Sequence, residues 1–154
     1  MHIRAAVIED IEKILELEKQ VFDIHFNARP DRIKKIPANY DRVKSIIESN
    51  DSKIFVAIND KDVLGYCTIC IRSIKDHVML HDMINIVIDD MCIDENQRNK
   101  GIGKFFFEEV KNFAKNTGAK NIELNVWEFN ENAIKFYEKI GMKTITRKME
   151  FKVE

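Results

Sequence analysis

The stretch that decides the fold runs Asp90-Met-Cys-Ile-Asp-Glu-Asn-Gln-Arg-Asn-Lys-Gly-Ile-Gly-Lys104. Its beginning closes an apolar run from about Met83 to Ile93 that predicts a strand. Behind it, apolar residues recur at helical spacing and predict a helix over about 101–116. Backbone amides at a helix start carry partial positive charge, and glycines let a phosphate approach them closely. The stretch therefore predicts a pyrophosphate-binding loop between a strand and a helix.

Two other phosphate-binding loops are excluded by the residues at the positions that these loops require. A Walker A loop needs Gly five residues before Gly103 and Ser or Thr after Lys104, but these positions hold Arg98 and Phe105. A dinucleotide-binding G-x-G-x-x-G needs Gly at the position of Phe106. The pattern that remains is R-x-x-G-x-G, and for this pattern alone two glycines in an ordinary loop stay an alternative.

The rest of the chain predicts strands and helices in the order β-α-α-β-β-β-α-β-α-β. Strands are expected at His2–Val7, Lys53–Ile58, Val63–Ile74, Met83–Ile93, about 122–127 and Met142–Val153, and helices at about 9–26, Tyr40–Ser49, 101–116 and about 130–140. This order predicts one α/β (α+β) domain over residues 1–154. Its sheet should be mixed and mostly antiparallel, with a right-handed parallel β-α-β crossover at 83–127 and helices on both faces.

A second motif lies downstream of the glycine loop. The segment Asn130-Glu-Asn-Ala-Ile-Lys-Phe-Tyr-Glu-Lys-Ile-Gly-Met142 resembles motif B of the GNAT superfamily of N-acetyltransferases, N-x-x-A-x-x-x-Y-x-x-x-G-F, with Met142 in place of the final Phe. The R-x-x-G-x-G loop resembles motif A of the same superfamily, Q/R-x-x-G-x-G/A. The close resemblance covers about residues 84–142, whereas the first 80 residues agree only in the order of elements.

The resemblance implies a role for each matching position. The backbone of the fourth strand would hold the pantetheine arm and the acetyl carbonyl, the glycine loop would bind the pyrophosphate, Asn130 would contact CoA while capping its helix, and Tyr137 would be the general acid. The implied cofactor-binding residues are Met91, Cys92, Ile93, Arg98, Asn99, Lys100, Gly101, Ile102, Gly103, Lys104 and Asn130.

The general base is not given by the motifs. Some relatives that acetylate ribosomal-protein N-termini carry Glu at the position of Asn125, and Asn cannot act as a base. Asp89 and Asp90 beside the cofactor strand are the candidates, and we take Asp90 as the catalytic one. Strand alternation puts the two on opposite faces unless a bulge intervenes. A base that acts through water, and a solvated acidic loop with no such role, stay open.

The function implied is an N-acetyltransferase that moves the acetyl group of acetyl-CoA to a primary amine by direct attack in a ternary complex. The acceptor would be a small molecule or a peptide or protein N-terminus, bound between segments 23–37 and 74–82. Acidic residues predict a cationic acceptor, namely Asp89, Asp90, Asp94 and Glu95. The alternatives are a non-catalytic acyl-CoA sensor and a transferase that uses a longer acyl-CoA.

Composition narrows the classes of partner. The formal net charge is -1, and no basic stripe indicates nucleic acid. No apolar run reaches the roughly 20 residues of a membrane span, so we expect no membrane insertion. We expect a cytoplasmic protein that is a monomer or a homodimer. Cys67 and Cys70 have C-x-x-C spacing, but inside a predicted strand they face opposite ways. We therefore expect reduced thiols there and in Cys92, and no metal, including at His77-x-x-x-His81.

Overall fold

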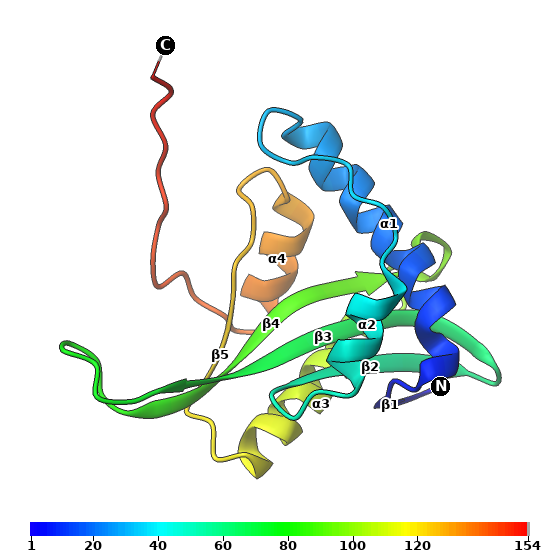
Figure 1. Cartoon of the computed structure of the whole chain (residues 1–154), viewed down its shortest axis with the longest axis horizontal. Coiled ribbons are helices and arrows are strands. Elements are labelled where there is room, and N and C mark those ends of the chain that lie inside the picture. Colours follow the sequence, from blue (N-terminus) through cyan, green and yellow to red (C-terminus); the bar gives the residue numbers. More distant parts are fainter. Residues whose placement is uncertain (154) are drawn as a thin grey trace.

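The computed structural model describes residues 1–153, and its centre is a five-stranded sheet (Figure 1). The strands stand in the order β1-β2-β3-β4-β5, with bounds β1 His2–Ala5, β2 Ser52–Asn59, β3 Asp62–Ile74, β4 Met83–Ile93 and β5 Asn121–Leu124. The first four pair antiparallel, and β5 pairs parallel to β4. This confirms the mixed, mostly antiparallel sheet and its parallel crossover.

Helices cover both faces of the sheet, as predicted. Their bounds are α1 Ile11–Ala28, α2 Tyr40–Ile47, α3 Ile102–Asn116 and α4 Glu131–Lys139. Alternation along β2 divides the core, because side chains at every second position share a face. Ile54 and Val56 pack with α1 and α2, whereas Phe55 and Ala57 pack with α3 on the other face.

The N-terminal strand is shorter than predicted, and α1 starts later. β1 ends at Ala5, and a short 3-10 helix (Ile8–Asp10) precedes α1. The Asp10 carboxylate accepts a hydrogen bond from the Val7 amide at 2.8 Å and pairs with Arg4 at 2.7 Å. These bonds favour a turn after Ala5, where the sequence pattern predicted that the strand would continue to Val7.

The strand predicted at Met142–Val153 is absent, which corrects the sequence-based order. The chain is extended there but pairs with no strand of residues 1–153. In Figure 1 it leaves the base of α4 and runs along one side of the molecule without joining the sheet, and Glu150 pairs with Arg29 after α1 at 2.7 Å. A strand exists only through hydrogen bonds to a neighbour, so the alternating pattern alone could not decide this segment.

The end of β4 separates from β5, and this separation creates the site. Thr68 pairs with Asp90 and Ile69 pairs with Ile88, so Asp89 is an extra residue in the ladder, a bulge that bends β4. The β4–β5 pairing ends at Ile88 and Leu124. The predicted strand at 122–127 is thus shorter, and from Asp89 to Ile93 one edge of β4 faces no strand of residues 1–153.

None of the helices described in residues 1–153 combines the length and apolar character that a membrane span requires.

Candidate active site

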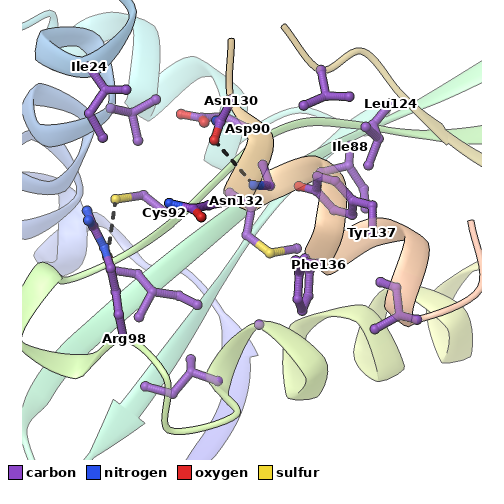
Figure 2. Close-up of a pocket in the computed structure, with 18 of the residues that line it drawn as sticks. Ile24, Ile88, Asp90, Cys92, Arg98, Leu124, Asn130, Asn132, Phe136 and Tyr137 are labelled. Atoms are coloured by element: carbon purple, nitrogen blue, oxygen red, sulfur yellow. Dashed lines mark hydrogen bonds between the residues drawn. The ribbon is translucent and has the colours of Figure 1, made fainter. Parts of the chain in front are cut away.

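A cleft of about 1490 Å³ opens where β4 and β5 separate. One wall is the end of β4, and the opposite wall is α4 with the segment that follows β5. The loop before α3 closes one end, and the second half of α1 closes the other (Figure 2). The two sequence motifs, about 30 residues apart in the chain, therefore face one cavity.

The glycine loop presents backbone amides at the start of α3. Gly101 precedes the helix with a left-handed φ of 82°, and no side chain caps the helix there. Within residues 1–153, no acceptor binds the amides from Asn99 to Gly103. Such amides form an anion site at the positive end of the helix dipole.

The two glycines serve different purposes. Gly101 supplies the left-handed turn, and a side chain on it would meet no atom within 4 Å. A Cβ on Gly103 would lie 3.0 Å from Phe136 Cζ and 3.4 Å from Ile93 Cδ1. Gly103 therefore lets the first turn of α3 pack against α4, a requirement that its place in the motif did not reveal.

Tyr137 lies on α4 with its ring beside Ile88 and Leu124, and its hydroxyl is directed into the cleft (Figure 2). Burial, and to a lesser degree the nearby Cys67 and Asp90, raises the pKa of this phenol. The hydroxyl has no hydrogen-bond partner among residues 1–153. Tyr137 therefore stays protonated at neutral pH, with its proton available to a bound ligand.

Asp90 lies on the opposite wall and accepts a hydrogen bond from the hydroxyl of the fully buried Tyr66. Burial raises the pKa of Asp90 to about 6, although the Tyr66 hydrogen bond acts in the opposite direction. A carboxylate with a pKa close to the working pH is suited to general base catalysis. The partner Tyr66 comes from the apolar run in β3 and carried no signal in the sequence.

The match to known proteins fits this geometry. The model of the Acetyltransferase (GNAT) family matches residues 11–142. The chain belongs to this family. Streptothricin acetyltransferase of Streptomyces lavendulae is 28% identical over 95 residues, which cover 61% of this chain and 46% of that protein. The chain thus matches about half the length of that relative.

Solved structures show the same fold over the whole chain. A tetramutant of the BH1408 protein from Bacillus halodurans is 28% identical with a TM-score of 0.96, and the alignment covers 99% of this chain and 100% of that one. An aminoglycoside N-acetyltransferase in complex with CoA has a TM-score of 0.75 at 15% identity, with 99% and 98% covered. This second likeness shows that the GNAT fold is shared.

Of two basic residues in the GNAT loop, one lines the cleft and the other does not. Arg98 lines the cleft, and its Nε donates to the Ile93 carbonyl at 3.3 Å. The Lys100 amine donates to Gln97 at 2.8 Å and does not line the cleft. The side chain of Lys100 is thus not placed for the cofactor role that the motif implied.

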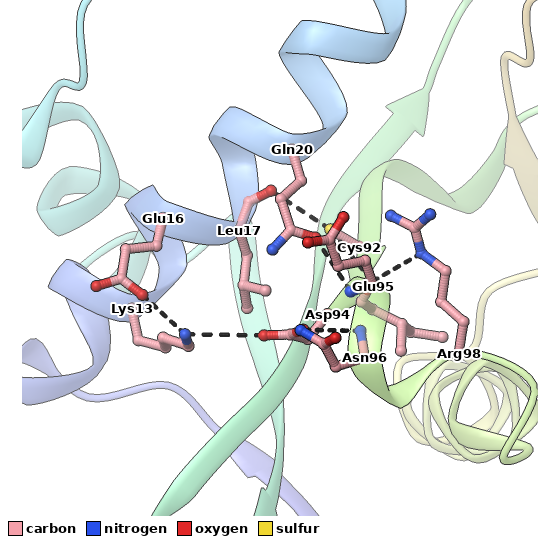
Figure 3. A network of polar contacts seen from close by, with 10 residues as sticks. Lys13, Glu16, Leu17, Gln20, Cys92, Asp94, Glu95, Asn96 and Arg98 are labelled. Atoms are coloured by element: carbon pink, nitrogen blue, oxygen red, sulfur yellow. Dashed lines mark hydrogen bonds and ion pairs between the residues drawn. The ribbon is translucent and has the colours of Figure 1, made fainter.

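Side-chain contacts from α1 hold the end of β4 and the loop in place (Figure 3). The Glu95 amide donates to the Gln20 side chain at 3.2 Å, and Lys13 pairs with Asp94 at 3.8 Å. The Cys92 thiol donates to the Leu17 carbonyl at 3.4 Å. Because α1 also closes one end of the cleft, these contacts connect the loop to that end.

The acidic cluster expected from the sequence is divided. Asp89 and Asp90 both line the cleft, because the bulge breaks the alternation that would have separated them. Asp94 and Glu95 lie outside the cleft, Asp94 capping the short 3-10 helix Glu95–Gln97. Of these four acidic residues, only the two at the bulge therefore face the inside of the cleft.

The cysteines have no paired arrangement. Cys67, Cys70 and Cys92 are free. Burial raises the pKa of the Cys92 thiol to about 12, with Asp90 adding to the effect. The thiolate form is therefore scarce at neutral pH, which argues against nucleophilic catalysis by Cys92. No cluster of three or more His, Cys, Asp or Glu side chains in residues 1–153 has the arrangement of a metal site.

The end of the cleft beside α1 is lined by residues that no motif indicated. Trp127 stacks on Phe129 with ring centroids 5.7 Å apart, and Phe129 meets the edge of His25 at 5.7 Å. His25 lies in the 23–37 boundary that we expected. The second expected boundary, 74–82, is wrong, because those residues form the far tip of the β3–β4 hairpin and do not line the cleft.

Two asparagines complete the cleft. Asn130 caps α4, as predicted, and its side chain accepts a hydrogen bond from the Ala133 amide at 3.3 Å. Its contact with CoA stays a prediction. Asn125 lines the cleft just beyond β5, so a side chain at this position reaches the site. The amide of Asn125 itself cannot act as a general base.

Proposed function

We propose that this GNAT chain transfers the acetyl group of acetyl-CoA to a primary amine by direct attack in a ternary complex. One observation carries the proposal. The unpaired edge of β4, the unpartnered amides of the glycine loop and the Tyr137 hydroxyl all face a single cleft. A long ligand with a pyrophosphate at one end and a thioester at the other would use all three.

The cofactor would lie along the loop and β4. The amides from Asn99 to Gly103 would bind the pyrophosphate, and Arg98 would add positive charge. Backbone groups of Met91, Cys92 and Ile93 would bind the pantetheine arm and polarise the acetyl carbonyl. Loss of one such hydrogen-bond donor to a developing oxyanion costs roughly 2.7–4 kcal/mol in transition-state stabilisation. The aminoglycoside acetyltransferase solved with CoA supports this choice of ligand by its fold.

Proton transfer would use the two sides of the cleft. Asp90 would accept the proton that the attacking amine releases, directly or through water. Tyr137 would donate its proton to the departing CoA sulfur, because its hydroxyl stays protonated and is directed into the cleft. Tyr66 would keep the Asp90 carboxylate oriented through its hydrogen bond.

The acceptor would enter between α1 and the Trp127–Phe129 segment, where the cleft stays open beyond the β4 bulge. Asp89 and Asp90 favour a cationic amine, small molecule or peptide N-terminus. The names of streptothricin acetyltransferase and the aminoglycoside acetyltransferases make those two compound classes the first to test. The three free cysteines suit a reducing compartment, and we propose a cytoplasmic location.

Thiol release from acetyl-CoA, measured against a panel of amines, tests the proposal. The panel should include streptothricin, an aminoglycoside, a polyamine and a peptide with a free N-terminus. We expect thiol release that depends on at least one amine and stops when the amine is acetylated beforehand. Octanoyl-CoA in place of acetyl-CoA tests acyl length. Tight CoA binding by calorimetry without release from any pair would indicate a sensor and contradict the proposal.

A further inference from the structure

The face of α1 that packs on the core includes a carboxylate. The buried residues of this helix are Ile11, Ile14, Leu17 and Glu18, and Glu18 keeps only 8% of its surface exposed. A carboxylate in such a place is unfavourable unless hydrogen bonds and an opposite charge compensate for the loss of water. The position of Glu18 therefore requires a partner.

The partner comes from α2. Nη2 of Arg42 donates to both carboxylate oxygens of Glu18, at 2.6 Å each. The Arg42 side chain is 41% exposed, so the pair joins a buried carboxylate to a guanidinium near the surface. Apolar residues of similar volume often replace a buried ion pair without loss of stability. Stability alone therefore gives little reason for this pair.

The ion pair lies on the same face of the sheet as Asp90. Leu17 and Val43 are the sequence neighbours of the two charged residues, and both belong to one apolar cluster. Tyr66 and Cys92 belong to the same cluster. The Cys92 thiol donates to the Leu17 carbonyl at 3.4 Å, which connects this turn of α1 to β4 (Figure 3). Residues two apart on a strand share a face, so Asp90 lies on the side of β4 that Cys92 occupies.

Two fixed charges of opposite sign act on Asp90 from this side. Burial is the main cause of the raised pKa of Asp90, and the Tyr66 hydrogen bond opposes it. Of the two charges, Glu18 raises the pKa of Asp90 and Arg42 lowers it. The other titratable groups that interact with Asp90 are neutral at pH 7, because burial raises the pKa of each, and they are Cys67 of β3, Cys92 of β4 and Tyr137 of α4. The adjacent Asp89 is exposed to solvent, which screens its charge.

We propose that Glu18 and Arg42 are positioning residues that set the proton affinity of Asp90, Glu18 increasing it and Arg42 limiting the increase. The inference rests on the proposed function, in which Asp90 is the general base. Such a base has to be ionised near neutral pH and still bind the proton of the amine, so its proton affinity must lie within a narrow range. Neither residue of the pair lines the cleft, so the pair acts on Asp90 without touching a bound ligand.

Carbon-13 NMR of protein labelled at the Asp carboxyl carbons measures the titration of Asp90 in the free protein, and Asp90→Asn assigns its signal. In Glu18→Gln we expect the titration to move down by about one pH unit, because a negative charge is lost and Arg42 acts unopposed. In Arg42→Met we expect it to move up by a similar amount, because Glu18 acts unopposed. Arg42→Lys keeps the charge and should titrate close to the parent.

Two controls separate charge from packing. Glu12→Gln removes the same charge from the exposed side of α1 and should leave the Asp90 titration unchanged. The double variant Glu18→Gln with Arg42→Met should return it towards the parent value, whereas two packing defects would add. Circular dichroism confirms folding. If Glu18→Gln does not fold, Arg42→Met and Arg42→Lys provide the same test at a partly exposed side chain.

The pH dependence of kcat/KM reports ionisation of the free enzyme, so its rising limb should move with the NMR titration in each variant. An Asp90 titration that stays at the parent pH in both folded single variants, or that moves in the same direction in both, would overturn the proposal. NMR titrations that move apart while the kcat/KM limb stays in place would support the control of Asp90 by the pair. That result would contradict only the role of Asp90 as the base in the proposed function.

Discussion

The two halves of β4 differ in what stands beside them. From Asn85 to Ile88 the strand lies between β3 and β5, with its side chains buried and both backbone edges paired. From Asp90 to Ile93 it keeps β3 but loses β5. One strand therefore belongs to the core in its first half and forms a wall of the cleft in its second. The change happens at the Asp89 bulge. The two halves therefore differ because only the first half pairs with β5, and not because their residue types differ.

The largest effect is expected from Asp90→Asn in the second half. Loss of the base should lower kcat/KM by about 10³, within the usual range for general base catalysis. In the parent protein, kcat/KM should rise with pH through about 6, the raised pKa of Asp90, and level off above it. A variant that keeps its activity, or a parent profile that is flat between pH 5 and 8, would exclude Asp90.

The same variant should not lose stability. Burial makes the folded protein bind the Asp90 proton more tightly than the unfolded chain does, so stability falls as pH rises from about 4 to about 6 and stays lower above that range. The difference between the ordinary 3.8 and about 6 corresponds to about 3 kcal/mol at most. Asp90→Asn should therefore melt at or above the parent temperature at pH 7.5, and at the parent temperature at pH 4.

The first half of β4 should behave in the opposite way. Ile86 is fully buried against α3, so Ile86→Ala should lower the free energy of unfolding by about 3 kcal/mol through lost packing and a cavity. Urea unfolding measures the change. The kcat of the folded enzyme should stay within about twofold, less than about 0.4 kcal/mol in the barrier. A drop in kcat comparable to that of Asp90→Asn would mean that the two halves are not separate.

Tyr137→Phe tests the wall opposite β4. Loss of the general acid should lower kcat by about 10², with little change in the KM for acetyl-CoA. Stability should not fall, because the hydroxyl has no hydrogen-bond partner among residues 1–153. The matched control is Tyr40→Phe at the start of α2, outside the cleft, which should turn over normally. Full activity in folded Tyr137→Phe would leave Tyr137 with a packing role only.

Gly103→Ala should weaken CoA binding through packing. The new methyl group lies 3.0 Å from Phe136 Cζ and pushes α3 away from α4. We expect affinity to fall about tenfold by calorimetry, equivalent to about 1.4 kcal/mol. Adding Phe136→Leu should restore part of the affinity. If the second substitution restores nothing, the methyl group blocks the phosphate itself, and the packing explanation is wrong.

The smallest effect concerns Asp89, the bulged residue. Raising salt to 0.5 M shortens the Debye length to about 4 Å, so the acceptor KM should rise by a factor of about three. Asp89→Asn should remove most of this dependence. Glu95→Gln lies outside the cleft and is the matched control, which should respond like the parent. A KM that does not change with salt would mean that acceptor charge is unimportant.

Local spacing was enough to predict much of this molecule. The R-x-x-G-x-G loop and the Asn130–Met142 motif indicated the family and brought attention to the loop and to Tyr137, because residue spacing decides which backbone amides begin a helix and which side chains share its face. Apolar periodicity likewise predicted α1, α3 and the strands of the sheet. These features depend on residues within a few turns of one another.

What only the tertiary structure decided depends on partners far apart in the chain. The bulge at Asp89 is defined by the register of β4 against β3, and the hydrogen bond between Tyr66 and Asp90 joins residues 24 positions apart. The requirement for glycine at position 103 comes from Phe136 on another helix. The segment 142–153 alternates like a strand but has no strand partner in residues 1–153. A sequence pattern specifies which face of a strand or helix a residue lies on, whereas hydrogen-bond pairing requires a second segment whose position only the folded chain provides.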